Sequence, residues 1–238
     1  MRERTATAHR STPTPSPPPV SPRSKCTVDV VVFTPRDGGL LMLTLPIERP
    51  RARDKVTLPW QVLRQGEALE DAARRLARTH LGADPAWIEQ VGAFADAVRH
   101  PSGAALSVCF AAVVAADGPP PPPPVVWRDA GDVGALAERQ RAMVAAAQRA
   151  LRNRMDYEPI PFRLLPALFT LSELQEIYEL LLGRRLHKAS FRRALHAAWL
   201  VEPTDEWRSE GRGRPAQLFR YAPRKRRGHR RAVRFDLL

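Results

Sequence analysis

The segment GEALEDAARRLARTHLG, residues 66–82, holds the acidic side chains best suited to metal-assisted chemistry. Glu67, Glu70 and Asp71 stand at positions i, i+3 and i+4, which share one face of a helix. Carboxylates grouped in this way can hold Mg²⁺ against a phosphate. The alternative is that acids in a first helical turn only complement the helix dipole. We favour this second interpretation and expect no metal at these residues.

A second group of side chains, near the C-terminal end, has spacings suited to DNA. Residues 190–200, SFRRALHAAWL, place their apolar members on one helical stripe and leave Arg192 and Arg193 off it. In a recognition helix such side chains reach the major groove. The candidate DNA contacts are Thr170, Lys188, Ser190, Arg192, Arg193, Arg212, Arg214 and Gln217. The alternative is a solvated basic face on an ordinary helical subdomain.

The elements that must position these contacts have clear sequence signals. TLSELQEIYELLLG begins with Thr170 and has Glu173 three residues later, which predicts a helix opened by a capping box and closed by Gly183. Ser190 is the expected N-cap of the next helix. Residues 200–223 predict two strands around the basic turn GRGRP, in which Arg212 and Arg214 can contact phosphates or a minor groove. Together these features predict a winged helix-turn-helix.

Composition and charge support a polyanionic partner. The chain has 238 residues and a formal charge of +13. Residues 151–238 carry 19 Lys and Arg against 10 Asp and Glu, or +9, whereas residues 1–150 carry 19 against 15, or +4. A GC-rich coding bias is an alternative source of part of this excess. The basic tail RKRRGHRR either adds nonspecific phosphate affinity or is a disordered end without a specific role.

Cysteine usage and hydropathy point to a cytoplasmic protein. Cys26 and Cys109 form no CxxC pair, so we expect no cysteine zinc site and a reducing compartment. No apolar run approaches the roughly 20 residues that span a bilayer. The N-terminus has no apolar core of a secretory signal. We therefore expect no membrane contact.

Changes in composition and residue pattern along the chain divide it into four parts. Residues 1–25 are rich in Pro, Ser and Arg and are predicted to be disordered. Residues 26–156 begin with strand signals, including the hairpin turn RDGG, and contain a helix in the middle and another at the end. We predict an α/β/α sandwich there, a winged helix at 157–223 and a basic tail at 224–238. The fold class is therefore α+β.

The helix at 66–82 also resembles the Nudix box, whose pattern is G, five residues, E, seven residues, then R-E-U-x-E-E-x-G-U, with U bulky and apolar. Glu67, Arg75 and Gly82 match this pattern. Gln61 replaces the first glycine, Ala83 takes the final apolar position, and Leu76, Thr79 and His80 replace the three other glutamates. Leucine offers no ligand, threonine offers a weak one, and a lone histidine suits Mg²⁺ poorly. We therefore predict a Nudix-like scaffold without catalytic residues, metal or cofactor.

Residues 26–222 as a whole resemble one family, the Nudix-related transcriptional regulators of NAD metabolism (NrtR-like). The family's LLP..FTL.ELQ..YE..LG..LDK.NFRR.L and GRPA.L.R are similar to LLPALFTLSELQEIYELLLGRRLHKASFRRAL and GRPAQLFRY here. Two departures, His187 for Asp and Ser190 for Asn, flank the expected recognition helix, so the operator sequence is expected to differ.

The segments of the Nudix-like domain that are expected to bind the effector depart further from the family pattern. RHPSGAALSVCFAAVV resembles RDPRG…VS..Y.A: Arg99 and Pro101 match, whereas His100 replaces Asp and Ser102 replaces Arg. The family's FDH appears as Glu138, Arg139 and Gln140, with no match.

The resemblance implies a homodimeric repressor of NAD metabolism genes that binds double-stranded operator DNA. Its Nudix-like domain would sense a nucleotide such as ADP-ribose. Arg49 and Arg99 are the candidates to meet the diphosphate, and Phe94 or Trp60 to stack on the adenine; for each aromatic, core packing is the favoured alternative. A Nudix pyrophosphohydrolase acting on ADP-ribose or a relative is the second hypothesis. A nonspecific nucleic-acid or scaffolding protein is the third.

Overall fold

The computed structural model describes residues 25–47, 55–95, 100–118, 120–209 and 214–222. The predicted tails, 1–25 and 224–238, lie outside these ranges except for residue 25. The strands are β1 (Cys26–Arg36), β2 (Gly39–Pro46), β3 (Val56–Thr57), β4 (Trp60–Val62), β5 (Trp87–Phe94), β6 (Leu106–Val113), β7 (Val126–Asp129), β8 (Val201–Arg208) and β9 (Ala216–Tyr221). The helices are α1 (Leu69–Leu81), α2 (Glu138–Met155), the 3-10 turn η1 (Ile160–Leu164), α3 (Leu171–Leu182) and α4 (Lys188–Ala198).

The first hairpin forms as its turn residues predict. β1 and β2 pair antiparallel with Arg36 opposite Gly39. Between them Asp37 and Gly38 have φ of 55° and 73°, and a two-residue turn with both φ positive matches the twist of the two strands. β1 is rich in β-branched residues and buried along nearly its whole length. It is therefore the central strand of the domain.

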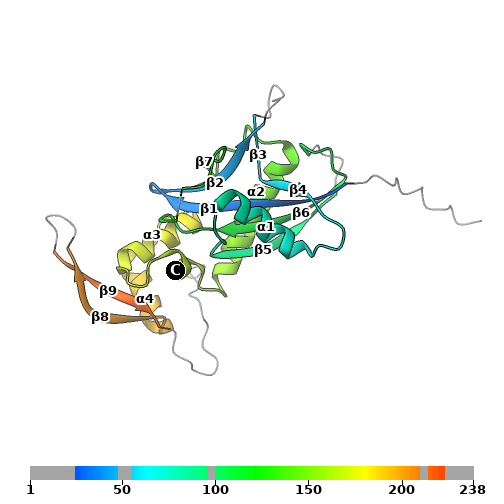
Figure 1. Cartoon of the computed structure of the whole chain (residues 1–238). Coiled ribbons are helices and arrows are strands. Elements are labelled where there is room, and N and C mark those ends of the chain that lie inside the picture. The colour runs from blue at the N-terminus through cyan, green and yellow to red at the C-terminus, as the bar shows by residue number, and fades with distance from the viewer. Residues whose placement is uncertain (1–24, 48–54, 96–99, 119, 210–213, 223–238) are drawn as a thin grey trace, which may run out of the picture.

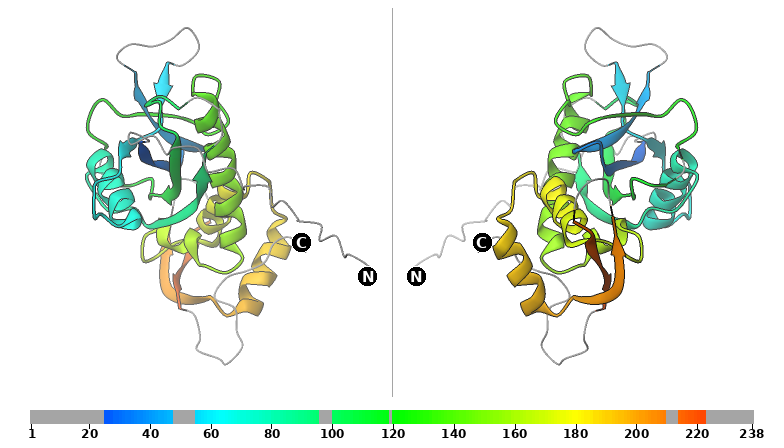
Figure 2. Two further views of the ribbon diagram at one scale, coloured as in Figure 1. Left: turned by 90° about the vertical axis from the view of Figure 1, so that its right-hand side faces the viewer. Right: turned by 90° about the vertical axis from the view of Figure 1, so that its left-hand side faces the viewer.

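The predicted α/β/α sandwich is confirmed. β1 pairs with β2 on one side and, parallel, with β6 on the other, in a seven-stranded mixed sheet. Alternate residues of β1 face opposite layers, because successive strand side chains point to opposite faces. Val28 and Val30 pack in the cluster that contains α1, and Val31 and Phe33 in the cluster that contains α2. Figures 1 and 2 show the two helices on opposite faces of the sheet.

The C-terminal part is the predicted winged helix. Thr170 accepts a hydrogen bond from the Glu173 N–H, and Glu173 accepts one from the Thr170 N–H, so the capping box at the start of α3 is present. Gly183 ends α3 with φ of 71°. β8 and β9 form the wing, which projects away from the sheet domain beside α4 (Figure 1). The prediction that Ser190 caps α4 is wrong: the N-cap is His187, and its side chain makes no capping hydrogen bond.

The two parts of the chain share a core. Leu151 and Met155, in the last turns of α2, belong to the same buried cluster as Phe162 of η1 and Tyr178 of α3. The Phe162 ring lies edge-on to the Tyr178 ring, with centroids 6.3 Å apart. The winged helix therefore packs directly on the end of α2 rather than hanging from a free linker.

Candidate effector site and DNA-binding surface

The helix that resembles the Nudix box keeps its scaffold but presents no set of metal ligands. Leu76 is 4% exposed and packs in the core between α1 and the sheet. The Thr79 hydroxyl donates to the Arg75 carbonyl oxygen at 2.8 Å. Burial lowers the pKa of His80, which favours a neutral ring. These three positions do not fit a Mg²⁺ ion, which prefers oxygen ligands gathered at one point.

Glu67 and Arg75, which match the box, instead form a hydrogen-bonded clamp with Gln61, which does not match it. Arg75 donates to both oxygens of Glu67, at 2.8 and 2.9 Å, and to Gln61 Oε1 at 2.6 Å. Gln61, at the position of the first glycine, also donates to the Ala72 carbonyl oxygen at 2.8 Å. The hydrogen bond from Arg75 is the main reason that the pKa of Glu67 lies below its usual value. The clamp fixes the start of α1 against β4.

The alternative site at Glu67, Glu70 and Asp71 gains no support from this geometry. Both Glu67 oxygens are taken by Arg75. Across the described ranges, no three His, Cys, Asp or Glu residues lie where they could hold a metal ion together. Glu70 and Asp71 stand in the first turn of α1, where they complement the positive end of the helix dipole.

The opposite face of the sheet carries a buried polar cluster, which we call the Asp29 network: Thr27, Asp29, Thr57, His100 and Gln140. One Asp29 oxygen accepts from His100 Nε2 at 2.8 Å and from Gln140 Nε2 at 3.3 Å. The other accepts from the Thr27 hydroxyl at 3.0 Å. The side chains of Asp29 and His100 are both 0% exposed. A buried carboxylate requires such donors, because leaving it unpaired costs several kcal/mol.

Hydrogen bonds also determine which nitrogen of His100 is protonated. The backbone N–H of Ser102 donates to His100 Nδ1 at 3.2 Å. A nitrogen that accepts a hydrogen bond carries no proton, so the ring proton lies on Nε2 and points to Asp29. At the first turn of α2, the buried Arg139 side chain donates to the Ala104 carbonyl oxygen at 2.7 Å. The segment that contains His100 is thus joined to both β1 and α2.

Sequence reasoning did not find Asp29, although it singled out two residues that meet there. His100 and Gln140 are the departures from the family's RDP and FDH motifs, and both donate to the same Asp29 oxygen. The only sequence signal was an aspartate in the otherwise apolar strand VDVVV. Because His100 and Gln140 are 71 and 111 residues away from Asp29 in the chain, spacing alone does not reveal these two partners.

Two of the four candidate effector residues lie on this face of the sheet. Trp60 is directly opposite Asp29 on the neighbouring strand, and Phe94 is opposite Ser107. Residues paired in this way point to the same side. The rings of Trp60 and His100 meet edge to face at 5.5 Å, while Phe94 packs partly buried against the core. The other two candidates, Arg49 and Arg99, lie outside the described residues.

The candidate DNA contacts divide into exposed and internally bonded side chains. Lys188, Arg192 and Arg193 on α4 are exposed, as is Arg214 at the tip of the wing. Arg212 lies outside the described residues. Three candidates make bonds within the domain: Thr170 caps α3, Ser190 lies 3.4 Å from His187, and Gln217 donates to the Thr204 carbonyl oxygen at 3.1 Å. The exposed cations therefore form the larger part of the candidate surface.

Two carboxylates hold this surface in shape. Glu179 of α3 accepts from the Leu186 N–H at 2.9 Å and from Arg185 at 2.8 Å, which fixes the connection into α4. Burial opposes ionisation of Glu179, but these bonds and one from Gln175 leave its pKa below the usual value. Glu173 also accepts from Arg208 of the wing at 2.6 Å. Through these hydrogen bonds α3 fixes the orientation of both α4 and the wing.

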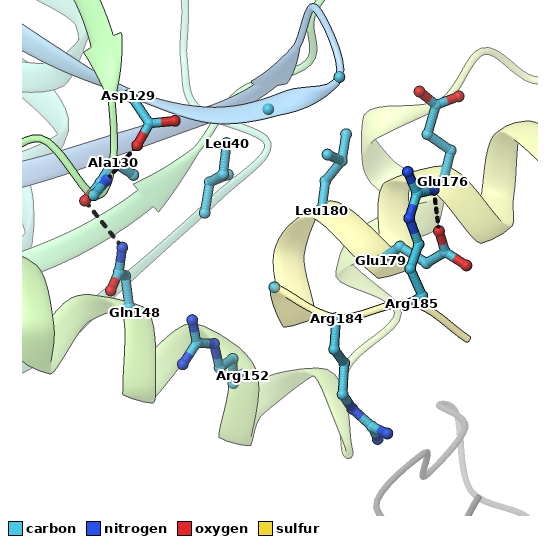
Figure 3. A pocket seen from close by; sticks show the side chains of 14 residues that line it. Leu40, Asp129, Ala130, Gln148, Arg152, Glu176, Glu179, Leu180, Arg184 and Arg185 are labelled. Atoms are coloured by element: carbon cyan, nitrogen blue, oxygen red, sulfur yellow. Dashed lines mark hydrogen bonds and ion pairs between the residues drawn. The ribbon is translucent and has the colours of Figure 1, made fainter. Parts of the chain in front are cut away.

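A cavity of about 430 Å³ lies at one part of the boundary between the sheet domain and the winged helix. Leu40 and Gly38 of the first hairpin, Arg152 of α2 and Leu180 of α3 all line it (Figure 3). Gln148 of α2 donates to the Ala130 carbonyl oxygen at 3.2 Å on the sheet side of the cavity.

None of the helices in the described ranges has the length and apolar character needed to cross a membrane.

Comparisons with known proteins extend over both parts of the chain. Residues 161–221 match the family described as the NrtR DNA-binding winged helix domain. The ADPR responsive transcriptional repressor NtrR of Acinetobacter baylyi is 31% identical over 210 residues, which make up 84% of this chain and 83% of that protein.

Solved structures agree with these matches. The structure of Shewanella oneidensis NrtR complexed with a 27mer DNA has a TM-score of 0.67 at 28% identity, covering 83% of this chain and 94% of that one. A MutT/nudix family protein from Enterococcus faecalis has a TM-score of 0.65 at 19% identity, covering 84% and 88%. The second likeness shows the fold alone.

Proposed function

Because this chain belongs to the NrtR family of Nudix-related transcriptional regulators, we propose that it is a homodimeric repressor of NAD metabolism genes that leaves its operator when ADP-ribose binds. α4 and the wing read double-stranded DNA, and the Nudix-like domain holds the nucleotide. The observation that carries the proposal is the set of exposed cations on α4, Lys188, Arg192 and Arg193. Such a repressor acts on the chromosome, so the proposal includes a cytoplasmic location.

The basic face of α4 supports DNA binding for physical reasons. Phe191 and Leu195 are fully buried and fix one side of the helix in the core, which directs Arg192 and Arg193 outward. Arginine forks match guanine edges and phosphates, so each base contact contributes about 1–3 kcal/mol of discrimination. Arg214 adds a further cation at the tip of the wing. Two relatives add further support for DNA binding: one is a transcriptional repressor, and another has been crystallised with DNA.

We further propose that the Nudix-like domain senses ADP-ribose and does not hydrolyse it. The relative in Acinetobacter baylyi is described as ADPR responsive. Trp60 is half-buried at the edge of the Asp29 network, on the α2 face of the sheet, and we assign it to the purine ring of the nucleotide. The absence of hydrolysis rests on α1, because Leu76 lies in the core where a metal ligand would have to stand.

The test is a titration of fluorescent DNA from the region upstream of the gene, against scrambled DNA, at several salt concentrations. We expect selective binding that ADP-ribose weakens. Arg192→Ala and Arg193→Ala should relax sequence preference or reduce the dependence of log K on log salt by about 0.9 per lost phosphate contact. Arg149→Ala is the matched control, since Arg149 is exposed on α2. Equal binding to both DNAs would contradict the proposal.

Two further measurements separate the alternatives. Light scattering should give the mass of a dimer. Deleting residues 224–238 should lower affinity for both DNAs alike, whereas loss of nearly all affinity would favour the nonspecific-binding hypothesis. Incubation with ADP-ribose and Mg²⁺ should release no AMP, and measurable release that disappears in Glu67→Gln would favour the hydrolase hypothesis.

A further inference from the structure

The Asp29 network joins the beginnings of two elements that both end at the winged helix. Asp29 lies near the start of β1, and Gln140 lies in the first turn of α2. Their side chains meet through the 3.3 Å hydrogen bond between Gln140 Nε2 and Asp29 Oδ1. Gln140 Oε1 also accepts from the Leu58 N–H at 3.2 Å, which attaches the segment between β3 and β4. The network therefore links the start of β1, the start of α2 and the segment between β3 and β4.

The far ends of the same two elements contact α3 and its end. The hairpin that closes β1 places Gly38 on the cavity wall shared with Leu180 of α3. Along α2, Gln140 and Arg152 are roughly 18 Å apart at 1.5 Å per residue. There the Arg152 guanidinium lies 3.3 Å from the position that a Cβ on Gly183 would take. Figure 3 shows Arg152 below this cavity, with Leu180 across it.

We propose that the Asp29 network is the positioning device that couples nucleotide binding at Trp60 to the winged helix. This inference rests on the proposed function and adds a regulatory role for Asp29, His100 and Gln140. They are positioning residues: they contact no DNA, and they set the relative placement of β1 and α2 on which α3 packs. A ligand shifts such an equilibrium only by binding its two states differently.

The buried position of the network suits it to this task. A ligand that stacks on Trp60 displaces the indole ring. The centroid of this ring lies 5.5 Å from that of His100, in an edge-to-face contact. His100 Nε2 lies 2.8 Å from Asp29 Oδ1. Because a buried donor or acceptor cannot be left unpaired cheaply, the network exchanges one bonded arrangement for another instead of deforming gradually. A small displacement at Trp60 is thereby passed to two rigid elements.

The test uses Gln140→Met, which keeps the side-chain length and removes the hydrogen bonds that link Gln140 to Asp29 of β1, to Leu58 and to the Thr57 hydroxyl. Thr44→Val is the control: it removes one hydrogen bond, from Thr44 to the Val126 carbonyl oxygen at 2.9 Å, at a fully buried site outside the network. For each full-length protein, operator affinity is measured without and with saturating ADP-ribose, and ADP-ribose affinity is measured separately by calorimetry. Amide hydrogen exchange is followed at residues 183–186.

Gln140→Met should keep its ligand-free DNA affinity within about two-fold, while the factor by which ADP-ribose weakens DNA binding falls at least about five-fold, the lower end of typical coupling. Exchange at residues 183–186 should accelerate in the ligand-free variant. Thr44→Val should change neither. An unchanged coupling factor in Gln140→Met would overturn the inference.

The exchange measurement keeps the inference testable apart from the proposed function. If ADP-ribose fails to move DNA binding in the unmodified protein, the proposed effector is wrong. The exchange rates then decide: acceleration at residues 183–186 in Gln140→Met alone supports a network that positions the winged helix, and equal rates in all three proteins overturn it.

Discussion

Replacing Glu179 separates the contribution of a buried carboxylate from that of the exposed arginine paired with it. One oxygen of Glu179 accepts from Gln175 and from the buried Leu186 N–H, at 2.8 and 2.9 Å. The other accepts from Arg185, whose side chain is 93% exposed. Because water screens the charge of the exposed Arg185 guanidinium, its pair with Glu179 contributes about 0–1 kcal/mol, whereas a buried N–H left without an acceptor costs about 1–3 kcal/mol.

These magnitudes predict an order of stabilities. Glu179→Gln keeps an amide oxygen for Gln175 and Leu186 and should lose about 1 kcal/mol. Glu179→Ala leaves the Leu186 N–H unpaired and should lose about 3 kcal/mol. Arg185→Ala should lose less than about 1 kcal/mol. Urea unfolding of the full chain measures all three, and hydrogen exchange at Leu186 locates the effect.

The same carboxylate gives a pH dependence of known sign. The pKa of Glu179 is lower in the folded protein than its usual value, so its ionised form stabilises the fold above the unfolded pKa of about 4.3. This contribution is lost as the pH falls through the folded pKa. The stability difference between the unmodified protein and Glu179→Gln should therefore shrink on acidification. A difference that grows, or an Arg185→Ala variant as unstable as Glu179→Ala, would refute the reasoning.

Three further predictions concern the sheet domain. Leu76→Glu should not create a Mg²⁺ site measurable by calorimetry, and it should lower the free energy of unfolding by several kcal/mol, because it buries a charge in the core behind α1. Burial lowers the pKa of His80, so the stability advantage of the unmodified protein over His80→Gln in urea titrations should decrease as the pH falls below about 6.5. Gly38→Ala should lose about 1 kcal/mol in thermal unfolding, because φ is +73° there; Gly92→Ala, where φ is not positive and the space is open, should be close to neutral.

Local signals predicted much of the fold because the interactions concerned are local. The capping box joins Thr170 to Glu173, three residues apart, and the RDGG turn needs only the backbone preferences of Asp37 and Gly38. The same kind of signal was wrong for α4, where Ser190 has a suitable side chain but the helix already begins at Lys188. A cap is decided by where tertiary packing starts the helix, and here the buried Phe191 anchors it.

The candidate effector site was predictable only in part because long-range register creates it. Trp60 and Phe94 were singled out as aromatic residues, but their placement on one face with Asp29 follows from strand pairing across β4, β1, β6 and β5. The motif comparison showed that His100 and Gln140 differ from the family. It could not show that a single carboxylate satisfies both of them.

The core shared by α2 and the winged helix limits how such proteins can be recombined. A chimera that exchanges DNA-binding halves between relatives at residue 157 would separate Leu151 and Met155 from the partners against which they are buried. The new half would meet a helix end shaped for a different protein. Successful exchanges of operator specificity should therefore carry the last two turns of α2 with the winged helix, or change only the exposed residues of α4. Diversification within the family is correspondingly expected to proceed by substitution on that helix rather than by shuffling of whole domains.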